Sequence, residues 1–418
     1  MKNITMKLVI SISIILLVLL AGYNSIAQTE IDKGWEHWAN GDIPEAQSVV
    51  ESILKLNPGD NEALHLQSLC LFVQGKYQEA IEAFSMMDTA YTKYGEVGRV
   101  MVDAYIHLNQ PQNALKLAKQ FKMEYADYFQ ELADKPFTCT AGRTFIIPFI
   151  DDKQLPSTFI PGVAGKINGN DVNIRFDTGG TFLILGKDMA EELGIELKFK
   201  STGMHGATRV TIWSNIADET ELGEGLVFKN VPVVIMESLG RFAIFGTSIL
   251  EQFLTTVDYP NSRFILTPRS LKHLYPEHLA LLPERQETVH FYMWGDHYMF
   301  AKGSFNRIGG LNFFFDSGLV ALTEIDGELK QAAFTASKEK LISWGFDESQ
   351  LEKTAFFPTE YPLSIKGLTQ ENTLIWYDAN LEKDRNFGGV RIDGLISHAF
   401  LSKYSWTIIP GYSGLNYV

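Results

Sequence analysis

The stretch Val172-Asn-Ile-Arg-Phe-Asp-Thr-Gly-Gly180 recurs in altered form as Leu311-Asn-Phe-Phe-Phe-Asp-Ser-Gly-Leu319. Aligned on Asp177 and Asp316, the two nonamers share Asn, Phe, Asp and Gly, and three of the differences are close replacements. Each nonamer has an apolar run typical of a buried strand, followed by an Asp in a turn that contains Gly. Two such carboxylates on matching strands suggest a pair that meets in space.

The two nonamers lie in regions of the same character, rich in short apolar runs separated by Gly, Asn and Asp. We therefore predict two β lobes related by duplication, at residues 140–269 and 286–418. Each lobe is expected to contain one helical interruption, at residues 188–193 in lobe one and 329–345 in lobe two. The other elements expected in lobe one are strands at 163–167, 171–176, 227–236 and 263–267, with a tight turn at Asn168-Gly169.

The motifs Phe176-Asp-Thr-Gly179 and Phe315-Asp-Ser-Gly318 resemble the active-site motifs of aspartic proteases. Residues 140–418 are similar to a two-lobed member of that family, retropepsin-like or pepsin-like, as found in exported bacterial proteins. In the family a later apolar segment ending in Gly packs behind each motif. Here these segments are Ile244-Phe245-Gly246 in lobe one and Leu395-Ile396-Ser397 in lobe two.

The resemblance implies an aspartic endopeptidase in which Asp177 and Asp316 form the catalytic dyad. Two adjacent carboxyls cannot both ionise readily, so they share one proton. The ionised member then takes a proton from water, and the protonated member polarises the scissile carbonyl. This chemistry needs no metal and no cofactor, and the substrate is a peptide or protein.

The resemblance also assigns supporting roles around the dyad. The hydroxyls of Thr178 and Ser317 are implied to hydrogen-bond across the interface between the lobes. Gly179 and Gly318 are implied to permit a backbone geometry that a β-carbon would oppose. Because both lobes lie in one chain, catalysis is expected without dimerisation.

Three positions depart from the family pattern. Gly180 and Leu319 stand where the family usually has Ala, and Ser397 replaces the expected late Gly of lobe two. If Ser397 displaced the Asp316 loop, the dyad would spread and the shared proton would be lost. This leaves two alternatives open: a non-catalytic protein that binds peptides in a degenerate cleft, or pairing of lobe one with lobe one of a second chain.

The stretch Ser201-Thr-Gly-Met-His-Gly-Ala-Thr208 sits where the family carries a mobile flap over the cleft. Its candidate flap residues are Gly203, Met204, His205 and Gly206; the alternative is an ordinary hairpin turn with His205 in solvent. His398 follows Ser397, but neighbouring residues of a strand face opposite ways, which argues against a Ser–His pair.

The N-terminal part has a different pattern, with a period of 34 residues. Gly41, Gly75 and Asn109 recur at this period, and so do Ala46, Ala80 and Ala114. The pattern resembles tetratricopeptide repeats, in which small residues allow two helices of a hairpin to approach closely. We therefore predict a multidomain chain with α-helical repeats at residues 28–135, followed by a mostly-β bilobal acid-protease fold. The repeats either offer a concave surface to a protein partner or a substrate tail, or serve as a structural spacer or a packing partner for the next domain.

The first 27 residues read as a secretory signal, because two lysines precede an apolar run that ends at Ser25-Ile-Ala27. Gln28 would then be the mature N-terminus of an exported protein, periplasmic or secreted; an uncleaved membrane anchor is the alternative. The net charge of −14 argues against a nucleic-acid partner. Cys70 and Cys139 are the only cysteines, and we expect two unreactive thiols rather than one bridge.

Overall fold

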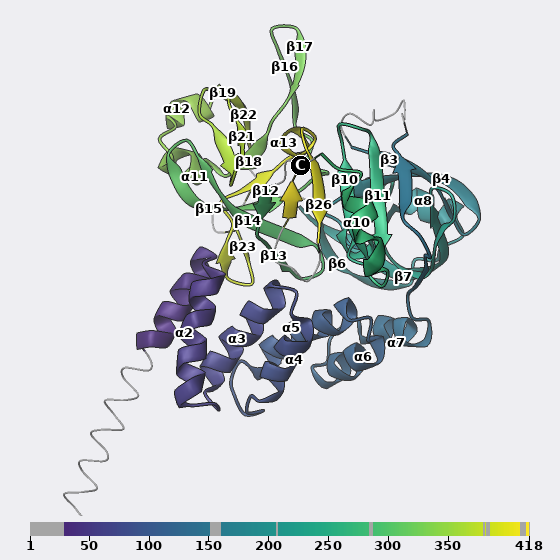
Figure 1. The fold of residues 1–418 in the computed structure, drawn as a ribbon, viewed down its shortest axis with the longest axis vertical. Coiled ribbons are helices and arrows are strands. Elements are labelled where there is room, and N and C mark those ends of the chain that lie inside the picture. Colours follow the sequence, from purple (N-terminus) through teal and green to yellow (C-terminus); the bar gives the residue numbers. More distant parts are fainter. Residues whose placement is uncertain are drawn as a thin grey trace, which may run out of the picture.

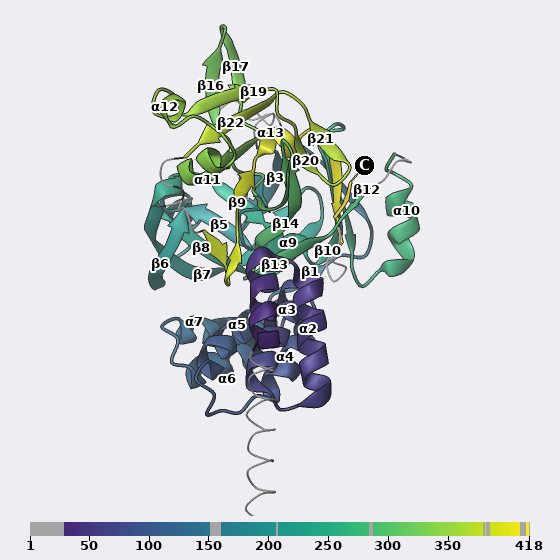
Figure 2. The ribbon, with the colours of Figure 1, turned by 90° about the vertical axis from the view of Figure 1, so that its left-hand side faces the viewer.

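The computed structural model describes residues 29–150, 160–205, 208–283, 287–378, 381, 385–409 and 415–417. The predicted signal, residues 1–27, lies outside these ranges. Figures 1 and 2 show the helical repeats packed beneath a larger, mostly-β part of the molecule. Among the described residues, no helix has both the length and the apolar composition required to cross a membrane.

The repeat module is a succession of helical hairpins. Gly41, Gly75 and Asn109 each lie between the two helices of a hairpin, with the positive φ that such a turn requires. The alanines of the same period are fully buried: Ala46, Ala80 and Ala114. The helices are residues 29–40, α2 (Ile43–Leu56), α3 (Asn61–Val73), α4 (Tyr77–Ser85), α5 (Tyr94–His107), α6 (Pro111–Gln120) and α7 (Ala126–Asp134).

Lobe one is built on a mixed sheet with strand order β1-β8-β5-β9-β4-β3-β7-β6. The predicted strand, turn and strand before Asp177 are confirmed, because β3 and β4 pair antiparallel around Asn168 and Gly169, both with positive φ. The predicted helix before Gly194 is also confirmed. The elements are β1 (Thr138–Thr140), β3 (Gly162–Ile167), β4 (Asn170–Asp177), β5 (Leu183–Gly186), α8 (Lys187–Glu192), β6 (Phe199–His205), β7 (Thr208–Leu222), β8 (Leu226–Met236), η1 (Glu237–Leu239), β9 (Ala243–Gly246) and α9 (Thr247–Leu250).

Lobe two repeats the central pairings of lobe one. β4 is parallel to β9, and β5 is antiparallel to β9 and parallel to β8. In lobe two β15 is parallel to β25, and β18 is antiparallel to β25 and parallel to β22. The sheet elements and helices are β13 (Phe291–Trp294), β14 (Tyr298–Phe305), β15 (Ile308–Phe315), β18 (Phe334–Ala336), α11 (Lys338–Ser343), α12 (Glu348–Leu351), β19 (Phe356–Thr359), β20 (Leu363–Ile365), β21 (Leu368–Gln370), β22 (Thr373–Tyr377), β25 (Gly394–Ile396) and α13 (His398–Leu401).

The helix expected at residues 329–345 is wrong over its first half. A projecting hairpin, β16 (Leu322–Ile325) and β17 (Glu328–Gln331), turns at Asp326-Gly327, a dipeptide that favours tight hairpins. The buried strand β18 follows, and only then does α11 begin, where Ser337 caps it by accepting from the Lys340 backbone N–H. Pairing of β18 with two neighbours therefore overrides the helical pattern of the sequence. A second small hairpin is formed by β23 (Asn386–Phe387) and β24 (Val390–Arg391).

A third sheet joins the two lobes, in the order β12-β27-β26-β10-β11-β2. β10 of lobe one pairs antiparallel with β26 of lobe two, and the hydroxyls of Thr256 and Thr407 meet across this junction at 2.7 Å. The lobes therefore share a sheet that neither completes alone. Its strands are β2 (Phe145–Pro148), β10 (Phe253–Asp258), β11 (Arg263–Pro268), β12 (Glu287–Val289), β26 (Ser405–Ile408) and β27 (Leu415–Tyr417); η2 (Lys272–Leu274) and α10 (Tyr275–Leu279) precede β12.

The repeats share a hydrophobic core with lobe two. Trp38 is 1% exposed, and its indole N–H donates to the carbonyl of Gly388 over 2.8 Å. The side-chain amide of Asn312, on β15, donates to the carbonyl of Asn40 over 2.9 Å. The lobe-two side chains buried in this common core are Tyr292, Phe300, Phe314, Leu381, Phe387, Val390, Ile392 and Leu395. The repeat module is therefore part of the same folded body as lobe two.

Replacing Trp38 by Ala should destabilise the repeats and lobe two together. Removing a fully buried Trp costs about 3–5 kcal/mol, and this side chain fills the common core. We expect one unfolding transition at lower temperature in calorimetry, with β and helical signals lost together. Leu56→Ala, at a residue that is 73% exposed, is the control and should change little. A helical transition that shifts while the β transition stays in place would contradict a common core.

Candidate active site

The two aspartates meet at the carboxyl ends of equivalent strands. Asp177 ends β4 and lies opposite Gly246 of β9 in the parallel pair, and Asp316 follows β15 and donates its backbone N–H to the Ile396 carbonyl over 3.0 Å. The two carboxyls are hydrogen-bonded to each other. The structure thus brings together the pair that the two nonamers suggested.

The backbone donors around the pair are distributed unequally. Asp177 Oδ1 accepts from the N–H groups of Gly179, over 2.7 Å, and of Gly318, over 2.9 Å. Asp316 Oδ1 accepts a longer bond of 3.1 Å from Gly318. Burial raises the pKa of Asp177, while these bonds oppose the rise. Burial and the neighbouring Asp177 together raise the pKa of Asp316 well above its usual range, so the pair as a whole retains one proton.

The two loops are clasped to each other by their hydroxyl residues. The Thr178 backbone N–H donates to Ser317 Oγ, and the Ser317 N–H donates to Thr178 Oγ1, both over 2.9 Å. Thr178 Oγ1 donates in turn to the Phe315 carbonyl over 2.8 Å. Both hydroxyl side chains are fully buried. These bonds across the lobe interface fix the separation of the carboxyls.

Gly179 and Gly318 are required by crowding. A β-carbon on Gly179 would lie 2.9 Å from Asp316 Oδ1, and one on Gly318 would lie 2.3 Å from Asp177 Oδ2. Neither glycine has the positive φ that would by itself exclude other residues. Any larger residue would therefore separate the carboxyls, which makes close approach the reason for glycine here.

Gly246 lies behind residues 177–181, called loop one below, as expected. A β-carbon at Gly246 would lie 2.1 Å from the Gly180 carbonyl oxygen. In lobe two the hydroxyl of Ser397 donates to the Ala332 carbonyl and accepts from the Ala399 N–H, capping α13. It therefore does not displace the Asp316 loop. Ser397 and His398 begin a helix, so the assumption that they belong to a strand is wrong.

Leu319 also fits without spreading the dyad. Its side chain packs against the core shared by the repeats and lobe two. Its backbone N–H donates to the Asp316 carbonyl over 3.2 Å, and its carbonyl accepts from His398 over the same distance. Leu319 is thus accommodated by packing in the core, and Ser397 is accommodated as the N-cap of α13.

The candidate flap is the hairpin of β6 and β7, in which Gly203 pairs with Val210. His205 hydrogen-bonds Ser238 over 2.9 Å at the end of this hairpin. Gly206 and the side chain of Met204 lie outside the described residues. Closure of this hairpin over the dyad stays a prediction.

Asp296 and His297 lie beside the loop that follows Asp177, and they were not predicted as site residues from the sequence. Asp296 Oδ2 accepts from Thr181 Oγ1, and Asp296 Oδ1 bonds His297 Nδ1, both over 2.5 Å. Burial opposes the charge of Asp296, but His297 and Thr181 outweigh it and hold the pKa of that carboxyl well below its usual range. The sequence Gly295-Asp-His297 lies in a turn, with no spacing that marks it.

Both cysteines are free thiols, as expected, and burial raises the pKa of Cys70 to about 12 and of Cys139 to about 11. The described residues hold no group of three or more His, Cys, Asp or Glu side chains placed to bind a metal ion.

Asp316→Asn should stabilise the protein increasingly as pH rises. The folded pair binds a proton that an unfolded carboxyl, with an ordinary pKa of 3.8, releases. Unfolding then becomes easier as pH rises from about 3.8 through the raised pKa. An Asn cannot ionise and avoids this loss. Thermal unfolding from pH 3.5 to 8 should show a gain over wild type that grows with pH, and a gain independent of pH would contradict the raised pKa.

Comparisons with known protein families agree with the sequence resemblances in lobe one and in the helical repeats. Residues 163–252 match the family described as "gag-polyprotein putative aspartyl protease", and residues 31–94 match the tetratricopeptide repeat family. No curated protein matches the chain.

Two solved structures are similar to parts of the chain. A retropepsin-like aspartic protease from Rickettsia conorii has 20% identity and a TM-score of 0.22, covering 32% of this chain and 92% of that one. An aspartic proteinase from Irpex lacteus has 8% identity and a TM-score of 0.38, covering 66% of this chain and 97% of that one. The family matches thus fall on part of the helical repeats and on most of lobe one, and the described fold is a set of helical repeats followed by a mostly-β part.

Proposed function

We propose that the chain is an aspartic endopeptidase with Asp177 and Asp316 as its catalytic dyad. The observation that supports this proposal is the hydrogen-bonded carboxyl pair, clasped by Thr178 and Ser317. A pair that shares one proton supplies a base and an acid at the same place. Both carboxyls come from one chain, which supports catalysis by a monomer.

The proposed reaction begins with a water molecule between the two carboxyls. The ionised carboxylate accepts a proton as the water oxygen attacks the peptide carbonyl carbon, and the protonated carboxyl donates its proton to the carbonyl oxygen. The amide nitrogen then takes the proton that came from water, and one hydroxyl of the tetrahedral intermediate returns its proton to the other carboxyl as the C=O bond re-forms. The C–N bond breaks, an acid and an amine leave, and the dyad again holds one proton. The asymmetric backbone bonds favour Asp177 as the base that accepts the first proton.

Asp177→Asn and Asp316→Asn should each lower kcat by at least about 100-fold, the usual loss on removing a general acid or base. Cleavage of a peptide library between pH 3 and 7 by residues 28–418, followed by mass spectrometry, measures this. Asp171→Asn, at an exposed position of the same β4 strand, is the matched control. Equal cleavage by all variants would contradict the dyad, and peptide binding without any cleavage would favour a peptide-binding protein.

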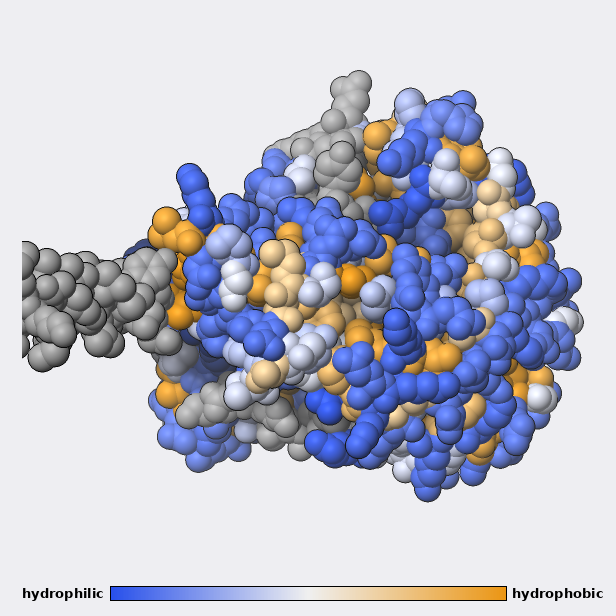
Figure 3. All heavy atoms as spheres, turned by 90° about the horizontal axis from the view of Figure 1, so that it is seen from below, coloured by the Kyte–Doolittle hydropathy of each residue, from blue (hydrophilic) through white to orange (hydrophobic). Residues whose placement is uncertain are grey.

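The repeats are proposed to recruit a protein partner or substrate. Seen from below, on the side of the repeats in Figure 1, the surface is mostly hydrophilic with hydrophobic side chains in small groups (Figure 3). Such a surface fits a partner that is recognised mainly by polar contacts.

We also propose that residues 1–27 direct export and are removed. The chain recovered from the periplasm or the medium should then begin at Gln28, which N-terminal mass spectrometry would reveal. Ala27→Leu, which enlarges the small residue before the cleavage site, should leave the signal attached. Recovery of intact Met1 from the wild-type chain would contradict cleavage.

A further inference from the structure

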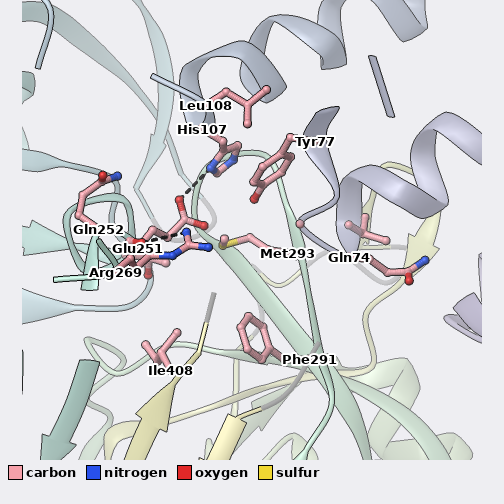
Figure 4. Close-up of a pocket in the computed structure, with 13 residues that line it drawn as sticks. Gln74, Tyr77, His107, Leu108, Glu251, Gln252, Arg269, Phe291, Met293 and Ile408 are labelled. Carbon is pink, nitrogen blue, oxygen red and sulfur yellow. Dashed lines mark hydrogen bonds and ion pairs between the residues drawn. The ribbon is translucent and has the colours of Figure 1, made fainter. Parts of the chain in front are cut away.

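His107, the last residue of α5 in the repeats, contacts both lobes of the protease-like part. Its Nδ1 lies 2.8 Å from Glu251 Oε2 of lobe one, and its Nε2 lies 2.8 Å from the Gly295 carbonyl of lobe two. The two charged side chains are only 3% and 9% exposed. Tyr77 stacks on the imidazole at 4.1 Å between ring centres. Figure 4 shows His107 directed at Glu251 across the junction.

Glu251 connects His107 to catalytic loop one through α9. The Glu251 backbone N–H donates to the Thr247 carbonyl over 2.9 Å. Thr247 then contacts loop one twice: its hydroxyl donates to the Thr178 carbonyl over 3.0 Å, and its N–H donates to the Gly180 carbonyl over 2.9 Å. A displacement of Glu251 would thus be passed to the residues that follow Asp177.

Gly295 connects His107 to the same loop by a second route. The next residue, Asp296, accepts from the hydroxyl of Thr181 over 2.5 Å, and its carbonyl accepts from Ser248 Oγ over 3.1 Å. One route reaches the loop after Asp177 through Glu251 and Thr247, and the other reaches it through Gly295 and Asp296. They contact this loop between residues 178 and 181. Both routes start at His107, so hydrogen bonds connect the repeats to two sides of the loop that carries Asp177.

A cavity of about 150 Å³ lies on one side of the ion pair (Figure 4). It is lined by residues of all three parts, among them Gln74 of the repeats, Arg269 of lobe one and Phe291 of lobe two. Since side chains do not fill this space, packing alone does not fix the position of Glu251 on that side. The Glu251 side chain is therefore positioned by its polar contacts, above all the bond to His107, while Arg269 donates to the Glu251 backbone carbonyl over 3.2 Å.

Burial opposes a positive charge on His107, but Glu251, the Gly295 carbonyl and Asp296 outweigh burial and raise its pKa to about 9. The imidazole is then protonated at neutral pH, with both nitrogens as donors. A single side chain can therefore hold both lobes at once.

We propose that His107 is a positioning residue for the proposed proteolysis, by which the docked repeats hold catalytic loop one in place. This inference rests on the proposed function. The repeats are then a working part of the catalytic machinery and not only a recruiting module. It follows that a partner which shifts α5 would alter turnover more than substrate affinity.

His107→Phe keeps the ring and its stack on Tyr77 but removes both hydrogen bonds. Thr181→Ala removes one hydrogen bond of the route through Asp296 with little risk to folding. Both variants should lower kcat by about tenfold to a hundredfold, the scale of a misplaced catalytic group, with KM within about twofold of wild type. The matched control is Lys302→Met, which removes the 2.9 Å ion pair of Lys302 with Asp42 elsewhere on the repeat–lobe interface. It should leave kcat unchanged.

Wild-type kcat in folded His107→Phe and Thr181→Ala would overturn the inference, and so would an equal loss in Lys302→Met. A second readout needs no catalysis: the pH-dependent rise in melting temperature caused by Asp316→Asn. This rise should shrink in the His107→Phe background, because a displaced loop separates the carboxyls. An unchanged rise overturns the positioning role. If the wild-type chain cleaves no peptide, but the rise is still smaller in the His107→Phe background, the proposed function is contradicted and the positioning role of His107 is not.

Discussion

The structure depends on holding two acidic groups within hydrogen-bond distance in a site largely surrounded by protein. Their repulsion and their loss of solvent both oppose this arrangement. The opposing forces are met by short backbone donors, by hydroxyls buried between the lobes and by the absence of two β-carbons. Each of these devices lies within two residues of an aspartate. The unfavourable repulsion and desolvation of the two carboxyls are thus offset by contacts close to them in the sequence. The sheets hold the two loops in position.

This support extends into the helical repeats. Side chains of lobe two pack into the hydrophobic core of the repeats, and Glu251 of lobe one bonds His107, the last residue of α5. The repeat module is therefore a structural neighbour of the site that holds the two carboxyls. The repeats, lobe one and lobe two therefore all contact the site or its supports, although the two carboxyls come from the lobes alone.

Much of this arrangement is readable in the sequence because it is local. The nonamers ending at Gly180 and Leu319, the 34-residue period of Gly41, and the Asn168-Gly169 turn each carry their own signal. Asp296 and His107 carry none, because their roles arise from contacts with residues more than 100 positions away. The same reason explains the error at 329–345, where burial of β18 between two strands outweighs a helical pattern. Ser397 looked like a defect because its helix cap could not be seen from the strand alone.

The sheet that joins the lobes determines when the carboxyl pair can assemble. Three of its strands are made early and three late, and β26, at residues 405–408, pairs directly with β10, at 253–258. During synthesis the repeats and lobe one emerge first and begin to fold first. The junction between the lobes cannot close until nearly the whole chain has left the ribosome. A nascent chain in which β26 has not yet formed therefore lacks the assembled carboxyl pair, and under the proposed function it would not cleave peptides.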